Sequence, residues 1–226
     1  MILEAIDEAA VSSPSTSVLA QLIRKLLHGQ LDGEKIAERS LEKEFGGSRT
    51  PVREALQLCE GFGFFERRRG SLQVKTPTLN ELEEIMELRT LVEPPFAERL
   101  ASRGKVESAE ATRHLQRLND QLGIGETEDP SSSEVKGRFV FADIQFHLCF
   151  AKLVGVSVVD QILGQLLTKT SLVFSRTLDD KGEIMGRIRK EHQAIIDAIS
   201  SQNPEEAKRA VLNHLEETKD RLGLTA

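Results

Sequence analysis

Apolar residues recur every three or four positions along most of the chain, and this spacing predicts a mainly α-helical protein. Near the N-terminus, the apolar positions from Val18 to Leu27 predict an amphipathic helix. Two shorter helices are predicted over residues 37–45 and 48–61, on either side of the glycine pair at 46–47. Two helices joined by a tight glycine turn form a helix-turn-helix, so we expect that motif here.

A different pattern follows the third helix. The segment FFERRRGSLQV, residues 64–74, predicts a strand, a turn at Arg69-Gly70 and a second strand. Three helices followed by a β-hairpin make a winged helix, which we assign to residues 15–77. Residues 1–14 are a short acidic leader, to which the pattern assigns no regular structure.

No strand pattern occurs after residue 77, and helical periodicity continues toward the C-terminus. Thr78 is predicted to cap a helix that runs through Ala101, with Glu81 as its capping-box partner and a kink at Pro94-Pro95. Five more helices are predicted, at about residues 107–122, 139–154, 158–178, 183–200 and 204–222. We therefore expect residues 78–226 to form an all-α helical bundle.

Composition excludes several classes of protein. Of the 226 residues, 39% are hydrophobic and 29% are charged, which is an ordinary balance for a globular protein. No apolar run is long enough to span a membrane, and the acidic N-terminus does not resemble a signal peptide. Two cysteines are too few for a disulfide framework. We expect a cytoplasmic protein with buried free thiols and no membrane partner.

Charge is distributed unevenly along the chain. The formal net charge is −6, but residues 15–76 carry 11 Lys and Arg against 8 Asp and Glu, whereas the remaining residues carry 19 against 28. A weakly basic N-terminal third beside an acidic body indicates two different tasks. The basic third is the part in which binding to nucleic acid is expected.

Polar and basic residues gather at the start of the third predicted helix. Recognition helices insert their N-terminal end into the major groove, where Arg can read guanine and Ser or Thr can bond phosphate or base edges. The basic side chains at the wing tip, Arg67, Arg68 and Arg69, would suit the neighbouring DNA backbone or the minor groove. The alternative is a solvated basic surface without a partner. The residues at the helix start are Ser48, Arg49, Thr50 and Arg53.

The segment AERSLEKEFGGSRTPVREALQLCEGFGFFERRRGSLQV resembles the DNA-binding half of the GntR family of bacterial transcription regulators. SRTPVREAL is nearly the family signature, and the resemblance covers about residues 18–76. Asp32-Gly33 departs from the Pro-Gly that is usual in the family. The resemblance implies double-stranded operator DNA as partner and close approach of the wing at Gly70. It implies DNA contacts by Arg39, Ser48, Arg49, Thr50 and Arg53.

Two polar residues interrupt an otherwise apolar helix in the second region. The helix over residues 139–154 is apolar almost all the way round, which indicates burial on most sides, yet it contains Asp143 and His147. These two are four apart and therefore project from one face. A buried carboxylate costs several kcal/mol unless it is paired or binds a metal, so a partner in the core is expected.

His192 and His214 are the candidates for that partner. They lie at similar distances before and after the turn at residues 201–204, so an antiparallel helix hairpin would place them level with each other. Both have aliphatic neighbours on their own face, which points them toward the core. With Asp143 and His147 they would form a site for Zn²⁺, Ni²⁺ or Mn²⁺. For each histidine alone, the alternative is a core residue bonded to a backbone carbonyl.

The second region resembles the all-helical effector domain of the FadR subgroup of GntR regulators, called the FCD domain. The resemblance rests on Asp-x-x-x-His in the central helix, on EHQAIIDAI and on NHL, and it implies the same four metal ligands. The resemblance is less dense in this region than in the DNA-binding half. The segment after the central helix, LVGVSVVDQIL, lacks an Asn that is common there in the family. LRTLVEPPFAERLA resembles the opening helix of the domain, where an Arg matching Arg89 faces the effector. The alternative for Arg89 is a salt bridge with Glu93.

Taken together, these patterns predict a homodimeric transcription regulator. A small carboxylic acid would bind at the metal, and Arg89 or Arg176 could neutralise a further carboxylate of that effector. One alternative is a helical metalloenzyme fused to a DNA-binding domain, because three histidines and a carboxylate can also activate water. Another is a metal-sensing repressor, in which the ion itself is the signal.

Overall fold

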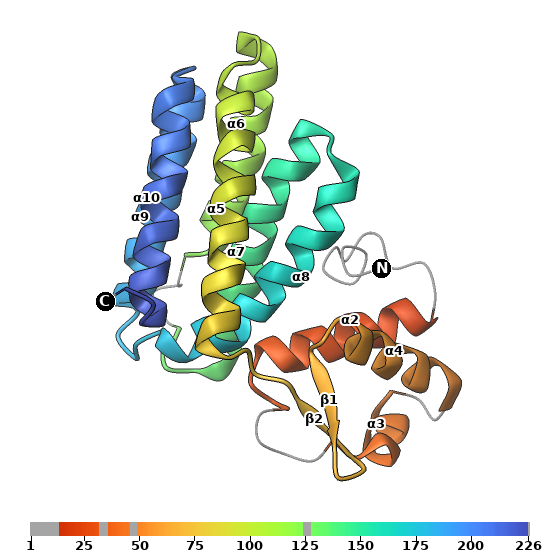
Figure 1. Cartoon of the computed structure of the whole chain (residues 1–226). Coiled ribbons are helices and arrows are strands. Elements are labelled where there is room, and N and C mark those ends of the chain that lie inside the picture. The colour runs from red at the N-terminus through yellow and green to blue at the C-terminus, as the bar shows by residue number, and fades with distance from the viewer. Residues whose placement is uncertain (1–13, 32–35, 46–48, 124–127, 226) are drawn as a thin grey trace.

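The computed structural model describes residues 14–31, 36–45, 49–123 and 128–225. Within them the chain forms a small winged helix at the N-terminal end and a larger bundle of helices after it (Figure 1). The acidic leader up to residue 13, the Asp32-Gly33 turn, the glycine pair at 46–47 and Ser48 lie outside the described residues. No helix of the described ranges has the length and apolar content needed to cross a membrane.

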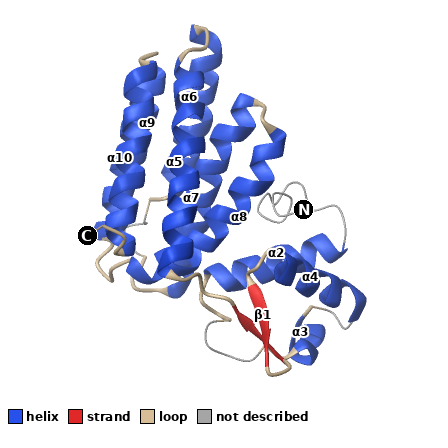
Figure 2. Ribbon diagram, in the orientation of Figure 1, coloured by secondary structure: helices blue, strands red, loops and turns tan. Residues whose placement is uncertain are grey.

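The predicted winged helix is confirmed. Its helices are α2 (Pro14–Leu27), α3 (Glu38–Glu44) and α4 (Arg49–Gly61), and its wing is an antiparallel pair, β1 (Phe65–Arg68) and β2 (Ser71–Val74). Ile36 adds an isolated bridge to Leu72 and so ties the chain before α3 to the wing. Figure 2 shows these as the only strands of the described chain, surrounded by helices.

The wing turns at the two residues predicted for it. Arg69 and Gly70 both have positive φ, at 49° and 78°, between strands paired in register from Phe65 with Val74 to Arg68 with Ser71. Two consecutive positive φ values are the signature of a tight two-residue hairpin, whose twist matches that of its strands. Glycine adopts such a φ without steric cost, which accounts for Gly70 at the second position.

The helical domain contains all six predicted helices. Two begin earlier than the periodicity indicated, at residues 105 and 133, and the fourth ends at residue 174, where a short 3₁₀ helix takes over. The other predicted bounds are confirmed to within a residue. The elements are α5 (Leu79–Ala101), α6 (Lys105–Gln121), α7 (Ser133–Val154), α8 (Ser157–Phe174), η2 (Ser175–Thr177), α9 (Glu183–Ser200) and α10 (Pro204–Leu222).

The capping box that begins α5 is formed as predicted. The Thr78 hydroxyl accepts a hydrogen bond from the backbone N–H of Glu81 at 3.2 Å, and the Glu81 carboxylate accepts one from the backbone N–H of Thr78 at 2.9 Å. Two donors that the helix itself leaves unpaired are thereby satisfied. Pro94 and Pro95 lie within the helix, which is assigned without interruption through Ala101.

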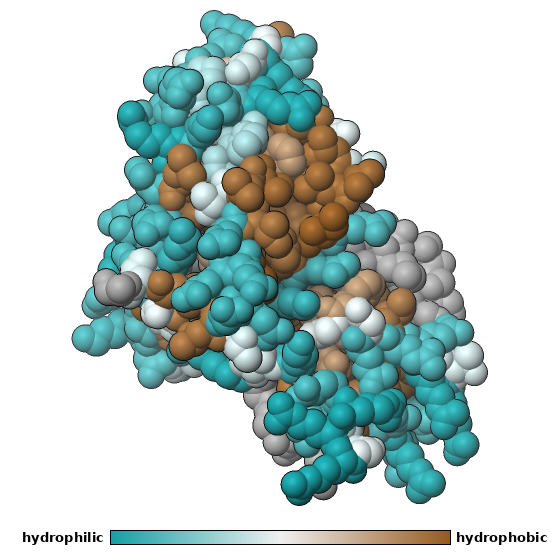
Figure 3. All heavy atoms as spheres, viewed as in Figure 1, coloured by the Kyte–Doolittle hydropathy of each residue, from teal (hydrophilic) through white to brown (hydrophobic). Residues whose placement is uncertain are grey.

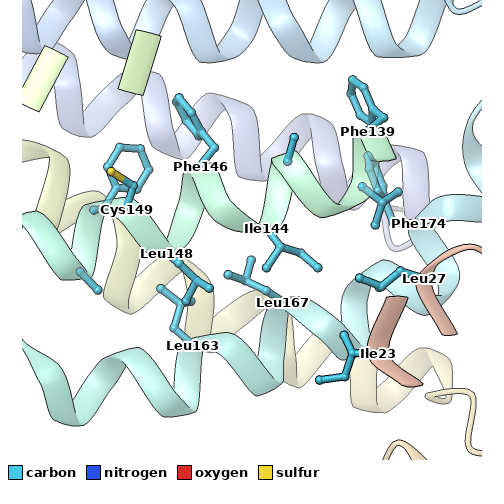
Figure 4. Packing of buried hydrophobic residues seen from close by; sticks show 14 of the residues in the cluster. Ile23, Leu27, Phe139, Ile144, Phe146, Leu148, Cys149, Leu163, Leu167 and Phe174 are labelled. Carbon is cyan, nitrogen blue, oxygen red and sulfur yellow. The ribbon is translucent and has the colours of Figure 1, made fainter. Parts of the chain in front are cut away.

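The winged helix packs directly on the helical domain. Helix α2 lies against α7 and α8, and its side chains Ile23 and Leu27 join the same apolar cluster as Ile144, Leu167 and Phe174 (Figure 4). All five side chains are buried. Within the helical domain, α5 lies against α7, α9 and α10, so the faces that carry the candidate metal ligands meet in the middle of the bundle.

Candidate metal centre and DNA-binding surface

Three histidines from three different helices converge in the bundle. His147 comes from α7, His192 from α9 and His214 from α10, and one ring nitrogen of each lies within 4.8 Å of the others. The side chains are 0%, 0% and 3% exposed. Asp143 lies at the edge of the group, with its Oδ1 3.5 Å from Nε2 of His192 and 3.9 Å from Nε2 of His147. The four residues singled out from the sequence therefore come together.

His147 is oriented by a buried carboxylate that sequence reasoning assigned only to Arg89. Glu93 on α5 lies 2.5 Å from Nδ1 of His147 through its Oε2, and 2.6 Å from Nε of Arg89 through its Oε1. Burial alone raises the pKa of Glu93, but the charges of Arg89 and His147 outweigh burial and hold that pKa well below its usual range. Glu93 is therefore a charged acceptor that favours a proton on Nδ1 of His147.

His214 has a parallel arrangement. Glu191 on α9 lies 2.8 Å from Nδ1 of His214, and the guanidinium of Arg221 on α10 is bonded to the same carboxylate. Burial lowers the pKa of His214, and the hydrogen bond with Glu191 opposes that shift. Glu191 is next to His192 in the chain but pairs with His214, a role that sequence reasoning missed.

His192 has no such support. Neither of its ring nitrogens has a hydrogen-bond partner among the described residues, and its ring stacks on Phe146 with a centroid separation of 3.9 Å. Burial, followed by the neighbouring His214 and His147, holds the pKa of His192 well below its usual value. The imidazole is therefore neutral, which is the form that binds metal.

The donor set fits a divalent ion. The Nε2 atoms of His147 and His214 face each other at 3.1 Å, while both Nδ1 atoms point at carboxylates. If the Nδ1 atom of each of these two rings carries the proton, the lone pairs of the two Nε2 atoms face and repel each other. A cation between the two Nε2 atoms removes this repulsion. The unpartnered ring of His192 supplies a third donor. Three neutral imidazoles and one carboxylate suit Zn²⁺, Ni²⁺ or Mn²⁺, and such an ion would act there as a Lewis acid for an anionic oxygen.

A small cavity adjoins the histidines. Its volume is about 10 Å³ for the centre of a water-sized sphere, which is room for about one water molecule or one ion. Arg89, predicted to face the effector, lines this cavity, and the salt bridge with Glu93 that was its alternative is present. Arg176 is exposed on η2 and is not part of the lining. The lining residues are Arg89, Asp143, Leu167, Thr170, Ser171, Phe174, His214 and Thr218.

The candidate DNA contacts lie on the surface of the winged helix. Arg49, Thr50 and Arg53 are exposed in the first turns of α4, and Arg39 is exposed on α3. Arg49 is 73% exposed and lies 3.4 Å from the carboxylate of Glu42, which is 12% exposed. Arg39 and Arg53 have no ion pair within the described part of the chain. Their charges are thus available to a phosphate or a base.

In the wing, the arginines differ in their surroundings. Arg67 is held by two carboxylates, Glu38 of α3 at 3.2 Å and Glu60 of α4 at 2.8 Å. Arg67 therefore braces the wing against the helices. Arg69 at the tip has no ion pair with any described residue and is exposed, as is Gly70, which leaves the charge of Arg69 accessible to DNA.

Comparisons with known proteins agree with this architecture. Residues 14–71 match the bacterial regulatory proteins of the gntR family, and residues 84–217 match the FCD domain. The chain belongs to the GntR regulators with an FCD domain. Members of this family are transcription regulators and not enzymes, which removes the metalloenzyme alternative.

Curated relatives of this GntR regulator include operon regulators. The Uxu operon regulator of Haemophilus influenzae is 27% identical, over 84% of this chain and 74% of that protein. The galactonate operon transcriptional repressor of Escherichia coli is 25% identical, over 91% of this chain and 95% of its own. A solved GntR-type structure from Rhodococcus sp. RHA1 superposes with a TM-score of 0.72 at 24% identity, covering 95% of this chain and 100% of that one, and supports the fold.

Proposed function

We propose that this GntR regulator is a homodimer that binds operator DNA through its winged helix and responds to a small carboxylic acid at a divalent ion in its FCD domain. The observation that carries the proposal is the convergence of His147, His192 and His214, with Asp143 at their edge. Within the described structure, neither ring nitrogen of the buried His192 has a hydrogen-bond partner, and because such groups are costly, this favours a ligand there.

DNA binding is supported by the position of the unpaired arginines. Arg53 lies one turn into α4 and Arg69 at the wing tip, which are the two places where a winged helix meets the major groove and the adjacent backbone. Arg39 on the neighbouring helix α3 extends the same exposed basic surface. We assign base or phosphate contacts to Arg39, Arg49, Thr50, Arg53 and Arg69, with Ser48 and Gly70 beside them.

An acid effector is supported by the lining of the cavity and by the relatives. Arg89 and the hydroxyl residues Thr170, Ser171 and Thr218 surround the space beside the histidines, which suits a carboxylate that also carries hydroxyl groups. Curated relatives are named for galactonate and gluconate operons, both of which concern sugar acids. Because the cavity has room for only about one water, the acid must enlarge it on binding.

A homodimer is supported by an apolar face of the helical domain. Figure 3 shows hydrophobic side chains gathered over the region of α5 and α8. Leu91 is 72% exposed on α5, and Val158 is 79% exposed on α8, with Leu88 and Ile162 beside them. A second copy of the chain would cover this face and would place two winged helices on the halves of a palindrome.

The proposal is tested by following DNA binding as ion and acid are added separately. Purified protein is stripped with a chelator, reloaded with Zn²⁺, Ni²⁺ or Mn²⁺, and assayed on operator DNA with and without a panel of sugar acids and small carboxylic acids. We expect about one ion per chain and a change in DNA affinity that needs both ion and acid. No metal bound and no acid response would contradict the proposal.

The small cavity also favours a second candidate, a regulator that senses the metal itself. A space for about one ion accommodates the metal without any enlargement. In that case the loaded protein would change its DNA affinity with no acid present, and adding acids would have no further effect. The same assay separates the two candidates, because metal-free and metal-loaded protein are compared before any acid is added.

A further inference from the structure

The charged groups around the histidines are arranged as two closed ion pairs and one open charge. Arg89 and Glu93 pair at 2.6 Å with side chains that are 3% and 0% exposed. Arg221 and Glu191 form the second pair, on the far side of His214, and Arg221 also lies 3.8 Å from the exposed carboxylate of Glu217 at the surface. Only Asp143 has no lysine or arginine bonded to it in the described structure, since its two closest contacts are Nε2 of His192 and Nε2 of His147.

This arrangement of charges determines which ligand charge the metal-loaded site can neutralise. The two ion pairs cancel internally, the three imidazoles are neutral ligands, and Asp143 balances one of the two positive charges of a divalent ion. One positive charge remains. We infer that the metal-loaded site is built for a ligand with a single negative charge, a monocarboxylate, and that it discriminates against dicarboxylates. This inference rests on the proposed function, because it concerns the acid that binds at the ion.

A second carboxylate would find no free cation. Among the described residues that line the cavity, Arg89 is the only lysine or arginine, and its charge is already paired with Glu93. Arg176, expected from the sequence to neutralise another carboxylate, is exposed and lies outside the lining. A buried carboxylate without a partner is strongly unfavourable. The hydroxyl residues Thr170, Ser171 and Thr218 can accommodate neutral hydroxyl groups at the position where a second carboxylate would be rejected.

The test compares acids that are matched in carbon number. Zinc-loaded full-length protein, freed of excess metal, is titrated calorimetrically with butyrate and succinate and with gluconate and glucarate. In each pair that binds, we expect the monocarboxylate to bind about ten-fold or more tightly than the dicarboxylate. The reason is that the second carboxylate of the dicarboxylate has no cation to pair with. The metal content is measured after each titration, so that removal of zinc by the acid is recognised.

Two variants test whether charge causes the preference for monocarboxylates. Glu93→Gln keeps an acceptor for Nδ1 of His147 but leaves Arg89 without its counter-ion at the cavity. The preference for the monocarboxylate should therefore become smaller or reverse in favour of the dicarboxylate. The double variant Arg89→Met with Glu93→Gln removes both charges and should restore the preference of the wild type. Glu98→Gln makes the same change five residues further along α5, on a partly exposed carboxylate that pairs with Lys208 at 3.2 Å, and should leave the preference unchanged.

The outcomes separate this inference from the proposed function. If both members of a pair bind equally tightly, the inference is overturned and the acid-responsive function stands. If neither acid of any pair binds to zinc-loaded protein, both are overturned. An unchanged preference in Glu93→Gln would remove the role assigned to the closed ion pair. Should that variant fail to fold, the comparison of matched acids on the wild-type protein decides the question by itself.

Discussion

The Nε2 atoms of His147 and His214 lie 3.1 Å apart, although the two residues are on different helices and 67 positions apart in the chain. Each ring is held from behind by a carboxylate, Glu93 for the first and Glu191 for the second. Two buried nitrogens directed at each other in this way are typical of a site that is completed by a cation. The predictions begin with that cation.

Removing His192 should empty the site. His192→Ala takes away the donor that has no other partner, so we expect it to lose most of the ion. A chelator should lower the melting temperature of wild-type protein, because an ion at about 100 times its dissociation constant stabilises the fold by about 2.7 kcal/mol. The chelator should have little effect on the variant. His114→Ala on the surface of α6 is the control and should keep both the ion and the chelator response. A full complement of metal in His192→Ala would exclude this histidine as a ligand.

Truncating Arg53 should weaken binding to operator DNA. Arg53→Ala removes an exposed, unpaired charge near the start of α4, and we expect a loss of about 1–3 kcal/mol of specific binding free energy if the side chain reads a base. Arg113→Ala removes an exposed arginine from the helical domain and should leave affinity unchanged at matched salt. Equal affinities of wild type and Arg53→Ala would take base reading away from this position.

The contact between His28 and Gly137 should couple the winged helix to the helical domain. A Cβ atom added at Gly137 would overlap the His28 ring. Inside α7, alanine is otherwise favoured over glycine by about 1 kcal/mol, whereas overpacking costs about 1–3 kcal/mol. We therefore expect Gly137→Ala to be neutral or destabilising in the wild type but stabilising when His28→Ala is present. Chemical denaturation of the four proteins of this cycle measures the difference, and purely additive effects would show that the two residues do not interact.

The capping box of α5 should confer a pH dependence on stability. The hydrogen bonds from Thr78 and then from Lys75 lower the pKa of Glu81 to about 2, from a usual value of 4.5. Because the folded state depresses this pKa, the stabilisation is fully present above about pH 4.5 and is lost as the pH falls toward 2. Thr78→Ala should cost about 0.5–2 kcal/mol near neutral pH. Glu81→Gln should flatten the acid limb of the stability curve, and Glu83→Gln on the exposed face of the same helix should not.

Charging the apolar face should separate the proposed dimer. Val158→Glu places a carboxylate among the exposed apolar side chains of α8 that belong to this face, where a second copy would bury it. Light scattering at micromolar concentration should show a monomer, with weaker operator binding because only one half-site is engaged. Val106 is equally exposed, at 77% against 79% for Val158, but lies on α6. Val106→Glu should therefore remain dimeric, and a dimeric Val158→Glu would place the interface elsewhere.

Local signals in the sequence were sufficient for the elements of the fold. The apolar period of α9 and α10, the capping pair Thr78 and Glu81, and the hairpin turn at Arg69-Gly70 each depend on neighbours within a few residues. The same applies to the four candidate ligands, because polar residues on apolar helix faces are recognisable wherever the helices pack. The GntR and FCD resemblances were read from motifs, and the matches over residues 14–71 and 84–217 confirmed the family, whereas the role of the four residues as ligands stays a prediction.

Only the tertiary structure decided what surrounds the histidines. The sequence placed Glu93 four residues from Arg89, and the salt bridge between them followed from that spacing alone. Its second partner, His147, lies 54 positions further along the chain and reaches Glu93 only when α5 and α7 pack. Helical periodicity fixes which face a side chain occupies but not the rotation and height at which two helices meet. For that reason the closed ion pairs, the small cavity and the exclusion of Arg176 from its lining emerged only from the packed bundle.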